Sequence, residues 1–309
     1  MSTPTLAIVT PSYNTGRYIG DAVRSVLEQN YPRVDYVVMD GGSTDGTVDV
    51  LRSFGPRLQW VSQKDKGQSD AINRGFARTE GEVLGWLNSD DTYAPGAFRA
   101  VAEVFAARPD VDLVYGDATY TDYRGRHVAD CLHVEPFDRD RLFDYTDFIV
   151  QPAAFFSRRI FERVGGIDAS IHWAMDYDLW LRIVAAGAKV VYLRRVLAHF
   201  RWLSDNKTAT GSHGRLDEIT RILGRHGRPL PAYNTLERCN LHGMEAVAAL
   251  RGRRWGEAAR SMNRVARELI KSPRAAGSLL SPQTWRVVHA GQILRRRAAA
   301  EHEATGPNR

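Results

Sequence analysis

The chain has 309 residues, of which 43% are hydrophobic and 25% are charged. These values are typical of a globular protein and exclude global disorder, and the length allows one large domain with an appendage rather than three domains. No apolar run is long enough to span a bilayer, and the first residues lack the charged start and long apolar segment of a signal peptide. We therefore expect the protein to reside in the cytoplasm.

The two cysteines and the net charge of the chain indicate which metal sites and binding partners to expect. Cys131 and Cys239 lie far apart and form no CxxC pair, so neither a disulfide framework nor a thiolate metal site is expected. The formal net charge is +6 and the pI is about 9.4, which favours a polyanionic partner such as a nucleotide or anionic lipid. The arginine-rich segment 251–297 carries no nucleic-acid recognition motif with interleaved aromatic residues, so nucleic acid is not expected as a partner.

Strands and helices alternate through the first part of the chain. Short apolar runs predict buried strands at 6–9, 36–39, 58–61, 83–87 and 113–115. Between them, apolar residues at helical spacing predict helices at 19–29, from 45–47 onward, at 70–77 and at 95–106. This alternation implies an α/β fold with a mostly parallel sheet flanked by helices. In such sheets ligands bind beyond the carboxyl ends of the strands. The polar side chains that follow each strand are therefore the first candidates for a binding site.

The second part of the chain is less regular. A turn at 123–126 between two short strands, an apolar run at 153–156, helices at 158–164 and 179–186 and a strand at 190–193 are predicted in that order. After about residue 206 the helical segments become rich in arginine, and no internal repeat is present. We therefore divide the chain into a domain of residues 1–205, with halves 1–117 and 118–205, and a helical basic region of residues 206–309.

Four loops that carry carboxylates follow or precede these elements. They are Asp40 with the glycine-rich stretch 41–46, Asp65 with Lys66 and Gly67, the run 88–91, and the run 175–178. The stretch 41–46 is not a dinucleotide fingerprint, because Ser43 stands at the middle glycine and the loop follows the second strand. It is interpreted as a turn with a helix N-cap at Thr44 or Asp45, whereas Asp40 at the strand end can accept a hydrogen bond from a nucleobase or ribose.

The doubled carboxylate of Asp90 and Asp91 is the strongest single signal. Two adjacent carboxylates repel each other, and a hard divalent cation with oxygen ligands such as Mg²⁺ or Mn²⁺ would remove that cost. The alternative is a solvated turn that caps the next helix. On these residues alone, both interpretations remain open.

Several motifs in family order resemble glycosyltransferase family 2. They are Ile8–Asn14, Val38–Thr47, Asp65–Gly67 with Asp70–Gly75, Gly81-Glu82 with Leu87–Asp91 and Pro95, and Gly165–Asp168 followed by Asp176–Arg182. Each motif is weak alone, but together they cover roughly residues 5 to 203 in order. The resemblance implies a GT-A fold and transfer of a sugar from a nucleotide sugar, with a UDP-sugar favoured, to a saccharide or lipid-linked acceptor.

The resemblance also implies roles for individual residues. A pocket for the nucleotide base and ribose is expected from Pro11, Ser12, Tyr13, Asn14, Asp40, Asp65, Lys66, Gly67 and Asp90. Asp91 is expected to bind the metal, Mg²⁺ or Mn²⁺, and Asp176 to act as the catalytic base of an inverting displacement of the hexosyltransferase type. Many relatives have Glu before the base, where this chain has Met175.

Three assignments keep an alternative. Asp178 is a less favoured base than Asp176, and Asp176 itself could be a helix N-cap. His199 is interpreted as a structural or acceptor-side histidine in preference to a metal ligand. A sugar-1-phosphate nucleotidyltransferase would need a glycine-rich basic loop at residues 11–14, and a non-catalytic carbohydrate-binding protein would not need Asp91 and Asp176 together.

The C-terminal region contains a basic amphipathic helix. Apolar residues from Trp255 to Ile270 recur at helical spacing between Arg251 and Arg274. Such a helix suits the anionic inner surface of a plasma membrane, which would fit a lipid-linked acceptor and a role in cell-envelope polysaccharide or glycolipid synthesis. The alternative is that the apolar face packs within the protein while the arginines are solvated.

Overall fold

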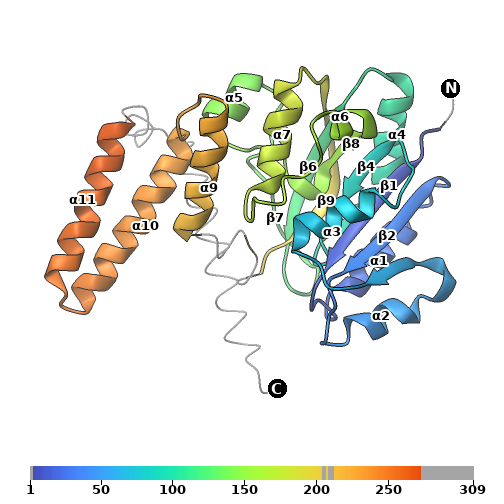
Figure 1. Cartoon of the computed structure of the whole chain (residues 1–309), viewed down its shortest axis with the longest axis horizontal. Coiled ribbons are helices and arrows are strands. Elements are labelled where there is room, and N and C mark those ends of the chain that lie inside the picture. Colours follow the sequence, from blue (N-terminus) through green and yellow to red (C-terminus); the bar gives the residue numbers. More distant parts are fainter. Residues whose placement is uncertain (1–2, 204–206, 208–211, 273–309) are drawn as a thin grey trace. The chain divides into compact units, whose positions relative to one another are not determined.

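A computed structural model describes residues 3–203, 207 and 212–272 (Figure 1). These residues form two compact units, one of residues up to 137 together with 148–202, and the other of residues 138–147 together with those from 203 onward. The segment 138–147, which we expected in the acceptor half of the first domain, thus belongs to the second unit. The predicted segment 206–309 lies partly outside the described residues.

The first unit is a sheet with helices on both of its faces (Figure 1). In chain order its elements are β1 (Leu6–Ser12), α1 (Ile19–Leu27), β2 (Val34–Asp40), α2 (Thr47–Ser53), β3 (Gln59–Ser62), α3 (Gln68–Phe76), β4 (Val83–Trp86), β5 (Thr92–Tyr93), α4 (Ala97–Ala107), β6 (Leu113–Thr121), β7 (His127–Asp130), β8 (Ala154–Ser157), α6 (Arg158–Arg163), α7 (Met175–Ala185) and β9 (Val190–Arg201). The strand order is β3-β2-β1-β4-β8-β6-β9-β5, with β7 paired to β6.

The α/β class is confirmed, and the parallel pairing is concentrated in the first half of the sheet. β1 pairs in parallel with β2 and β4, and β2 with β3. In the second half β6 and β9 are parallel, but β8 runs antiparallel to both β4 and β6, and β5 runs antiparallel to β9. Because β1, β2, β3 and β4 point the same way, the loops that follow them meet at one edge of the sheet.

The sheet is buried on both faces because its strands consist of continuous apolar runs. Alternate residues of β1 point to opposite faces: Leu6 and Ile8 belong to the core that contains the apolar stripe of α1, while Val9 faces α3. At this contact Gly75 of α3 is necessary, because a Cβ there would lie 2.4 Å from a methyl group of Val9. The layers on either side of β1 are therefore set by sequence alternation and by one glycine.

A second core beneath α7 consists of aromatic rings. Trp180 of α7 stacks on Trp86 of β4 with ring centroids 5.7 Å apart, and Phe156 of β8 meets Trp180 edge to face. Trp86 and Trp180 are fully buried, so this cluster removes a large apolar area from water. The cluster fixes α7, and with it the side chains of its first turn, against the sheet.

The second unit is helical, with α5 (Arg139–Asp144), α9 (Ser212–Arg225), α10 (Ala232–Arg251) and α11 (Trp255–Lys271) (Figure 1). α10 and α11 pack along one another as an antiparallel hairpin. Arg228 joins α5 to the segment after α9 through an ion pair of 2.9 Å with Asp144. Among the described residues, none of the helices has the length and apolar character needed to cross a membrane.

Candidate active site

The ends of β1 and β2 are held side by side by the strand register. Ser12, the last residue of β1, pairs with Asp40, the last residue of β2. The loops beyond them are tied together, because the backbone N–H of Asn14 donates to Ser43 Oγ at 2.7 Å and the N–H of Thr44 donates to Asn14 Oδ1 at 2.9 Å. Pro11 and Ser12 are buried and Tyr13 is exposed to solvent, so the predicted nucleotide-binding run ends at the surface.

Asp40 is buried and organises the loop that follows it. Its carboxylate accepts hydrogen bonds from the N–H groups of Gly42 and Ser43 at 3.1 and 3.0 Å, and from the hydroxyl groups of Ser43 and Ser62. These hydrogen bonds tie the Asp40 carboxylate to the loop backbone and fix the loop conformation. A direct contact between Asp40 and a nucleotide stays a prediction.

The turn after Asp40 differs in one detail from the interpretation of the sequence. The N-cap of α2 is Gly46, in a left-handed conformation with φ 91°, and not Thr44 or Asp45. Asp45 nevertheless serves the helix start, because its carboxylate accepts from the N–H of Thr47 at 3.1 Å and from that of Gly16 at 2.9 Å. The loops after β1 and β2 are thus linked a second time.

Asp65 stands over the end of β2. A Cβ added at Gly41 would lie 2.9 Å from Asp65 Oδ2, so the absence of a side chain at position 41 is what allows Asp65 to approach. Its other oxygen accepts from the N–H of Gly67 at 2.8 Å, and Lys66 between them is exposed. The predicted site residues 12–14, 40 and 65–67 are therefore neighbours at one edge of the sheet.

The pair Asp90–Asp91 follows β4 at the same edge, and Asp91 is buried with 1% of its surface exposed. Its Oδ1 accepts from the backbone N–H of Arg201 at 2.9 Å, and its Oδ2 from the side-chain amide of Asn88 at 3.3 Å. Burial, followed by repulsion from Asp90, raises the pKa of the Asp91 carboxyl well above its usual value. The alternative of a solvated turn that caps the next helix is wrong, since Asp91 is buried and α4 begins after Gly96.

Arg201, at the end of β9, holds the Asp90–Asp91 loop and was missed in the sequence. Its buried guanidinium donates to the carbonyl oxygen of Asp90 at 2.8 Å, to that of Tyr123 at 2.7 Å and to the carboxylate of Asp21 at 3.0 Å. It also lies 4.8 Å from the ring centre of Tyr18. An arginine at the end of a strand was the available signal, but its partners are too far away in the chain to be foreseen.

A row of side-chain amides connects the loop that carries Asp90 and Asp91 to α3. Asn88 donates to Gln151 at 3.0 Å and accepts from Gln68, the first residue of α3, at 2.7 Å. Gln151 is buried and donates to the carbonyl oxygen of Trp86 at 2.8 Å. Gln68 and Gln151 were not singled out in the sequence, because amides give no distinctive spacing.

The first turn of α7 carries the predicted base. Asp176 is the second residue of α7 and is half-buried; the N-cap is Ala174, so the N-cap alternative for Asp176 is wrong. Met175 is buried and accepts a hydrogen bond at its sulfur from Ser69 of α3 at 2.9 Å. Since Ser69 follows Gln68, contacts run from the Asp91 loop through α3 to the residue beside Asp176.

Asp178 has a structural partner. It is fully buried and forms an ion pair of 2.7 Å with Arg182, which in turn donates to the carbonyl oxygen of Val164 at 2.8 Å. A buried carboxylate paired in this way fixes α7 to the segment after α6 and is shielded from an acceptor. The geometry favours Asp176 over Asp178 as the base.

His199 of β9 lies in register with Thr92, the residue after Asp91. Its Nδ1 is 2.8 Å from Thr119 Oγ1, and burial lowers the pKa of the imidazole, which favours the neutral ring. The bond to Thr119 accounts for a structural role, and a role toward an acceptor or a metal stays a prediction.

The donor set at this edge suits a hard divalent cation. Asp90 and Asp91 offer adjacent carboxylate oxygens, and a cation there would offset both the burial of the Asp91 charge and its repulsion from Asp90. Two hydrogen bonds to Asp91 leave further lone pairs on its oxygens. These carboxylates lie at the edge formed by the loops after β1, β2 and β4, and the binding of a metal ion or a diphosphate there stays a prediction.

Comparison with known proteins agrees with this geometry. Residues 7–165 match the family model described as glycosyl transferase family 2. An uncharacterised glycosyltransferase of Mycobacterium tuberculosis is 28% identical over 229 residues, 73% of this chain and 84% of the relative. Chondroitin synthase of Escherichia coli is 28% identical over 245 residues, which are 77% of this chain but only 35% of that enzyme.

Two solved structures share the fold over nearly the whole chain. A mannosyltransferase from Pyrobaculum calidifontis in complex with GDP-Man and Mn²⁺ superposes with a TM-score of 0.59 at 20% identity, covering 97% of this chain and 87% of the other. S. aureus TarS 1–349 in complex with UDP-GlcNAc has a TM-score of 0.61 at 14% identity, covering 99% and 93%. These likenesses confirm the GT-A fold and give no support to a nucleotidyltransferase or a non-catalytic carbohydrate-binding protein. Because the family model covers half of the sequence and the fold agrees with it, the chain belongs to glycosyltransferase family 2.

Proposed function

We propose that the protein transfers a sugar from a nucleotide sugar to a hydroxyl group of an acceptor, with inversion at the anomeric carbon and with Mg²⁺ or Mn²⁺ bound. The observation that carries this proposal is the buried Asp91 beside Asp90, linked through Asn88 and α3 to the first turn of α7. In this proposal Asp91 would bind the cation, and Asp176 in α7 would be a separate, more exposed carboxylate.

The donor side is formed by the loops after β1, β2 and β3. Their backbone is fixed by Asp40, Asn14 and Asp65, so a nucleoside would bind to a preformed surface at little cost in loop entropy. The TarS structures contain UDP or UDP-GlcNAc and the mannosyltransferase contains GDP-Man, which supports a nucleotide sugar as the donor. We favour a UDP-sugar.

Asp91 would hold the metal, with Asp90 directed toward the ribose or the metal. The cation supplies charge neutralisation for the diphosphate. Asp91 is held in place by Arg201 and Asn88 independently of any ligand, so the site is preorganised for that charge. The Mn²⁺ in the mannosyltransferase complex supports a divalent cation.

Asp176 would act as the general base. It takes the proton of the acceptor hydroxyl while that oxygen forms a bond to the anomeric carbon. The bond from this carbon to the diphosphate oxygen breaks, and the nucleoside diphosphate leaves with the electron pair. A single displacement of this kind inverts the anomeric carbon and needs only one carboxylate base. Met175, at the place where many relatives have Glu, is taken up by packing on Ser69 and offers no second carboxylate.

A panel of UDP- and GDP-sugars tests this proposal through release of the nucleoside diphosphate. We expect release from at least one donor with Mn²⁺, and loss of release when EDTA replaces the metal. Release that is equally fast in EDTA would contradict the metal proposal, and release from no donor with any acceptor or water would contradict the transfer proposal. The configuration of the product, measured by NMR, distinguishes inversion from retention.

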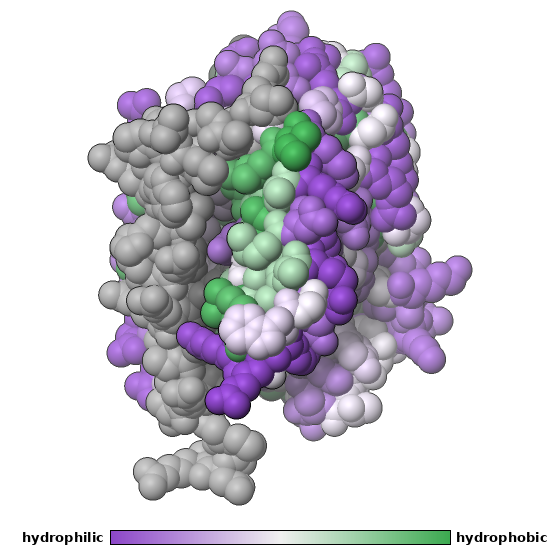
Figure 2. All heavy atoms as spheres, turned by 90° about the vertical axis from the view of Figure 1, so that its left-hand side faces the viewer, coloured by the Kyte–Doolittle hydropathy of each residue, from purple (hydrophilic) through white to green (hydrophobic). Residues whose placement is uncertain are grey.

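We further propose that the second unit binds the anionic inner surface of a membrane, where a lipid-linked acceptor for cell-envelope polysaccharide would be found. Part of the apolar face of α11 packs on α10 through Ala258 and Ser261, but another part is exposed. The exposed part includes Trp255 at 69%, Met262 at 54% and Ile270 at 77% of their surfaces. Figure 2 shows an apolar strip on this side of the molecule, bordered on the right by hydrophilic side chains.

The charge of α11 fits an anionic surface. The helix carries Arg260, Arg264, Arg267 and Lys271 against Glu257 and Glu268. By helical spacing Arg260 and Arg267 lie on the flank next to the exposed apolar strip, and each basic residue near such a surface contributes about 1 kcal/mol. Exposed aromatic and aliphatic side chains beside arginines are what an interfacial helix requires.

Sedimentation with vesicles that contain phosphatidylserine tests the membrane proposal. We expect the full chain to pellet with them at low salt and to be released at high salt, and the variants Met262→Glu and Ile270→Glu to stay in the supernatant. Leu132→Glu is the matched control, because Leu132 is 75% exposed but belongs to the other unit. Binding by all variants alike, or by none of the proteins, would contradict the proposal.

A further inference from the structure

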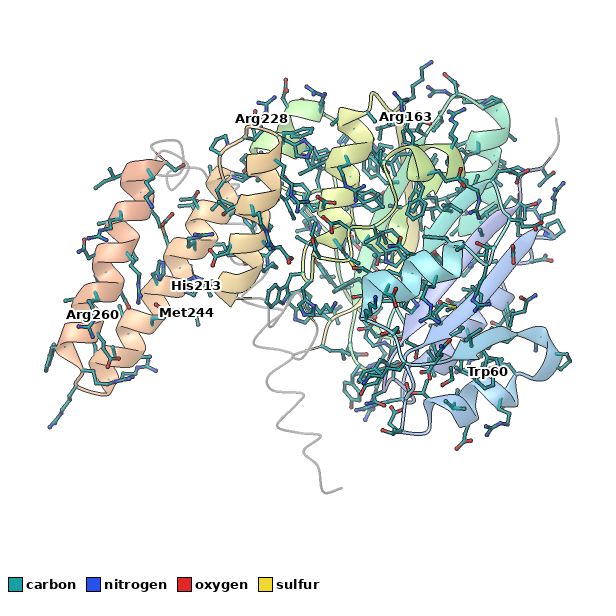
Figure 3. All side chains as sticks on the ribbon, in the orientation of Figure 1. Trp60, Arg163, His213, Arg228, Met244 and Arg260 are labelled. Atoms are coloured by element: carbon teal, nitrogen blue, oxygen red, sulfur yellow. The ribbon has the colours of Figure 1, made fainter. Side chains whose placement is uncertain are left out.

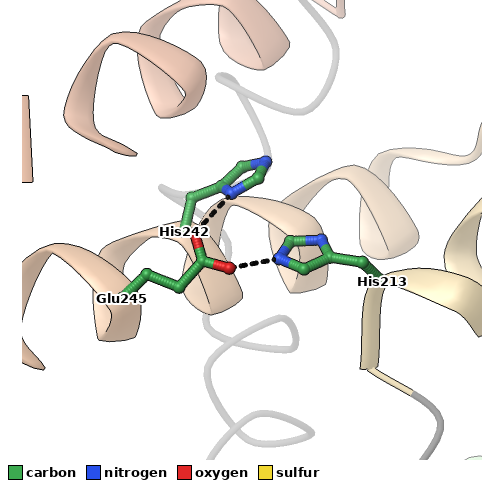
Figure 4. A group of neighbouring side chains, drawn as sticks. All are labelled: His213, His242 and Glu245. Atoms are coloured by element: carbon green, nitrogen blue, oxygen red, sulfur yellow. Dashed lines mark hydrogen bonds and ion pairs between the residues drawn. The ribbon is translucent and has the colours of Figure 1, made fainter. Parts of the chain in front are cut away.

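A cluster of two histidines and one glutamate lies in the second unit, which contains none of the catalytic residues proposed above. His213 is in the first turn of α9 (Figure 3), and His242 and Glu245 are one turn apart on the same face of α10. Residues separated by three positions on a helix are neighbours, so His242 and Glu245 are presented together, and α9 brings the third side chain. The three side chains converge in Figure 4.

The ligand atoms are close enough for a single ion. One ring nitrogen or carboxylate oxygen from each residue lies within 4.8 Å of the other two. His213 Nε2 is 2.9 Å from Glu245 Oε1, and His242 Nδ1 is 3.2 Å from Glu245 Oε2. Ligands at about 2.0–2.2 Å from a Zn²⁺ ion are separated by similar distances, so small rotamer adjustments would suffice.

We propose that His213, His242 and Glu245 form a second metal site, which binds a borderline transition metal of the Zn²⁺ class. Two imidazole nitrogens and one carboxylate oxygen are a common set for Zn²⁺ and are poorly suited to Mg²⁺, which prefers oxygen ligands. The site therefore differs in its metal from the oxygen-ligand site of Asp91. A fourth position can be taken by water, because Glu245 is 42% and His213 33% exposed.

The surroundings of Glu245 divide its two oxygens between different tasks. Oε2 also faces Arg264 Nη2 at 3.0 Å and Ser261 Oγ at 3.4 Å, both on α11. Oε1 contacts His213 instead and is the oxygen better placed for the ion. Donors that hold the outer oxygen of a ligating carboxylate orient it, as in other metal sites, although the positive charge of Arg264 opposes the cation.

The competing explanation is a metal-free network in which each imidazole donates one hydrogen bond to Glu245. In that network the two rings lie against each other, with centroids 4.4 Å apart and planes inclined by 28°. Two imidazole rings this close together can also bind one cation between them. Either arrangement joins α9 to α10, and direct measurement of metal binding separates them.

The site has a structural consequence that is independent of catalysis. An ion bound by His213 on one helix and by His242 and Glu245 on the other cross-links α9 and α10. A ligand that binds the folded state and not the unfolded state stabilises it. Loss of this ion should therefore loosen the second unit while leaving donor hydrolysis at the Asp91 site intact.

The test is a titration of the full-length, tag-free chain with Zn²⁺ in competition with a chromogenic chelator. Excess Mg²⁺ is present throughout, so that the site of Asp91 is occupied. We expect one Zn²⁺ per chain, and a loss of at least about tenfold in affinity for His213→Gln and for His242→Gln. His127→Gln is the matched control: His127 is an exposed histidine that pairs with a carboxylate, Asp130, at 3.1 Å, and its loss should leave the affinity unchanged.

Two further measurements make every outcome decisive. Circular dichroism and nucleotide binding report whether the variants are folded, and Glu245→Gln provides a variant that keeps a hydrogen-bond acceptor for the imidazoles but loses the charged ligand. Co²⁺ in place of Zn²⁺ should give a visible absorption band typical of histidine ligation in the wild type and not in the folded variants. If the wild type binds no Zn²⁺ in excess Mg²⁺, or if folded His213→Gln and His242→Gln bind it like the wild type, the second metal site is refuted.

Discussion

Replacement of Arg201 by methionine should destabilise the first unit more than any surface substitution of similar size. The change preserves much of the apolar stem but removes the donors to the carbonyl oxygens of Asp90 and Tyr123, the ion pair with Asp21 and the contact with Tyr18. A lost hydrogen bond from a charged group costs about 1.5–3 kcal/mol. The half-exposed ion pair adds at most about 1 kcal/mol, and the cation–π contact about 0.5–1 kcal/mol.

Together these costs predict that Arg201→Met lowers the free energy of unfolding by about 4 kcal/mol. This value is near the lower end of their sum, because water can reach part of the vacated space and hydrate the groups that lose their partner. For a unit of this size, that corresponds to a fall in Tm of roughly 8–16 °C. Thermal unfolding followed by circular dichroism measures it, with Arg194→Met, an exposed arginine of the same strand, as control. A fall in Tm no larger than that of the control would refute the assigned role of Arg201 in holding the Asp90–Asp91 loop.

Three other substitutions separate chemistry from stability. Asp176→Asn should retain nucleotide binding but lose at least about a hundredfold in kcat, as expected for a general base, and near-normal kcat would exclude it from that role. Asp178→Asn should instead lower stability, by up to about 3–5 kcal/mol in denaturant titration, because it leaves Arg182, whose side chain is only 22% exposed, without its charge partner; an unchanged midpoint would show that the pair is dispensable. Burial lowers the pKa of His133 to about 4. The unfolded imidazole takes up its proton near pH 6.5, so the free energy of unfolding should fall as the pH drops from about 6.5 to about 4. His133→Gln should flatten that part of the pH profile, and an identical profile would show that another group is responsible.

The local pattern of the sequence was sufficient for the first half of the sheet. β1 and β2 contain apolar runs and end at the polar residues Ser12 and Asp40, β4 is a short apolar run, and each lies within a few residues of its predicted place. The alternation of strands with helices predicted that these strands are parallel. It was therefore foreseeable that Asp40 and Asp91, which follow β2 and β4, lie at the same edge of the sheet. What the pattern could not give is the pairing partner of each strand.

The second half of the first unit was harder to predict, because its pairing joins distant segments. β6 and β9 run far beyond their apolar starts at 113–115 and 190–193, since later polar residues such as Thr119 and His199 are satisfied across the pair. The start of α7 lies at Met175 rather than at residue 179 because Met175 packs on Ser69 of α3. Such tertiary contacts override the local secondary-structure propensity, and they cannot be predicted from the spacing of residues in the sequence.

The residues of the candidate site also fall into those that the sequence predicted and those that it did not. The carboxylates stood out because charged residues at strand ends are few, whereas Arg201 and Gln151 carry no spacing signal. The cluster of His213, His242 and Glu245 was also not predicted from the sequence, because only two of its members lie on the same helix. Residues that act from a distant element become visible once the fold is known.

The central claim is that Asp91 binds the metal through which a nucleoside diphosphate is held at the carboxyl edge of the sheet. Calorimetric titration with UDP and with GDP, in Mn²⁺ and in EDTA, tests it most directly on the wild type and on Asp91→Asn, which keeps the shape of the buried side chain. We predict that Mn²⁺ strengthens the binding of at least one nucleotide to the wild type, and that Asp91→Asn binds it equally weakly with and without the metal. Binding that ignores Mn²⁺ in the wild type, or that responds to it undiminished in Asp91→Asn, would contradict the claim.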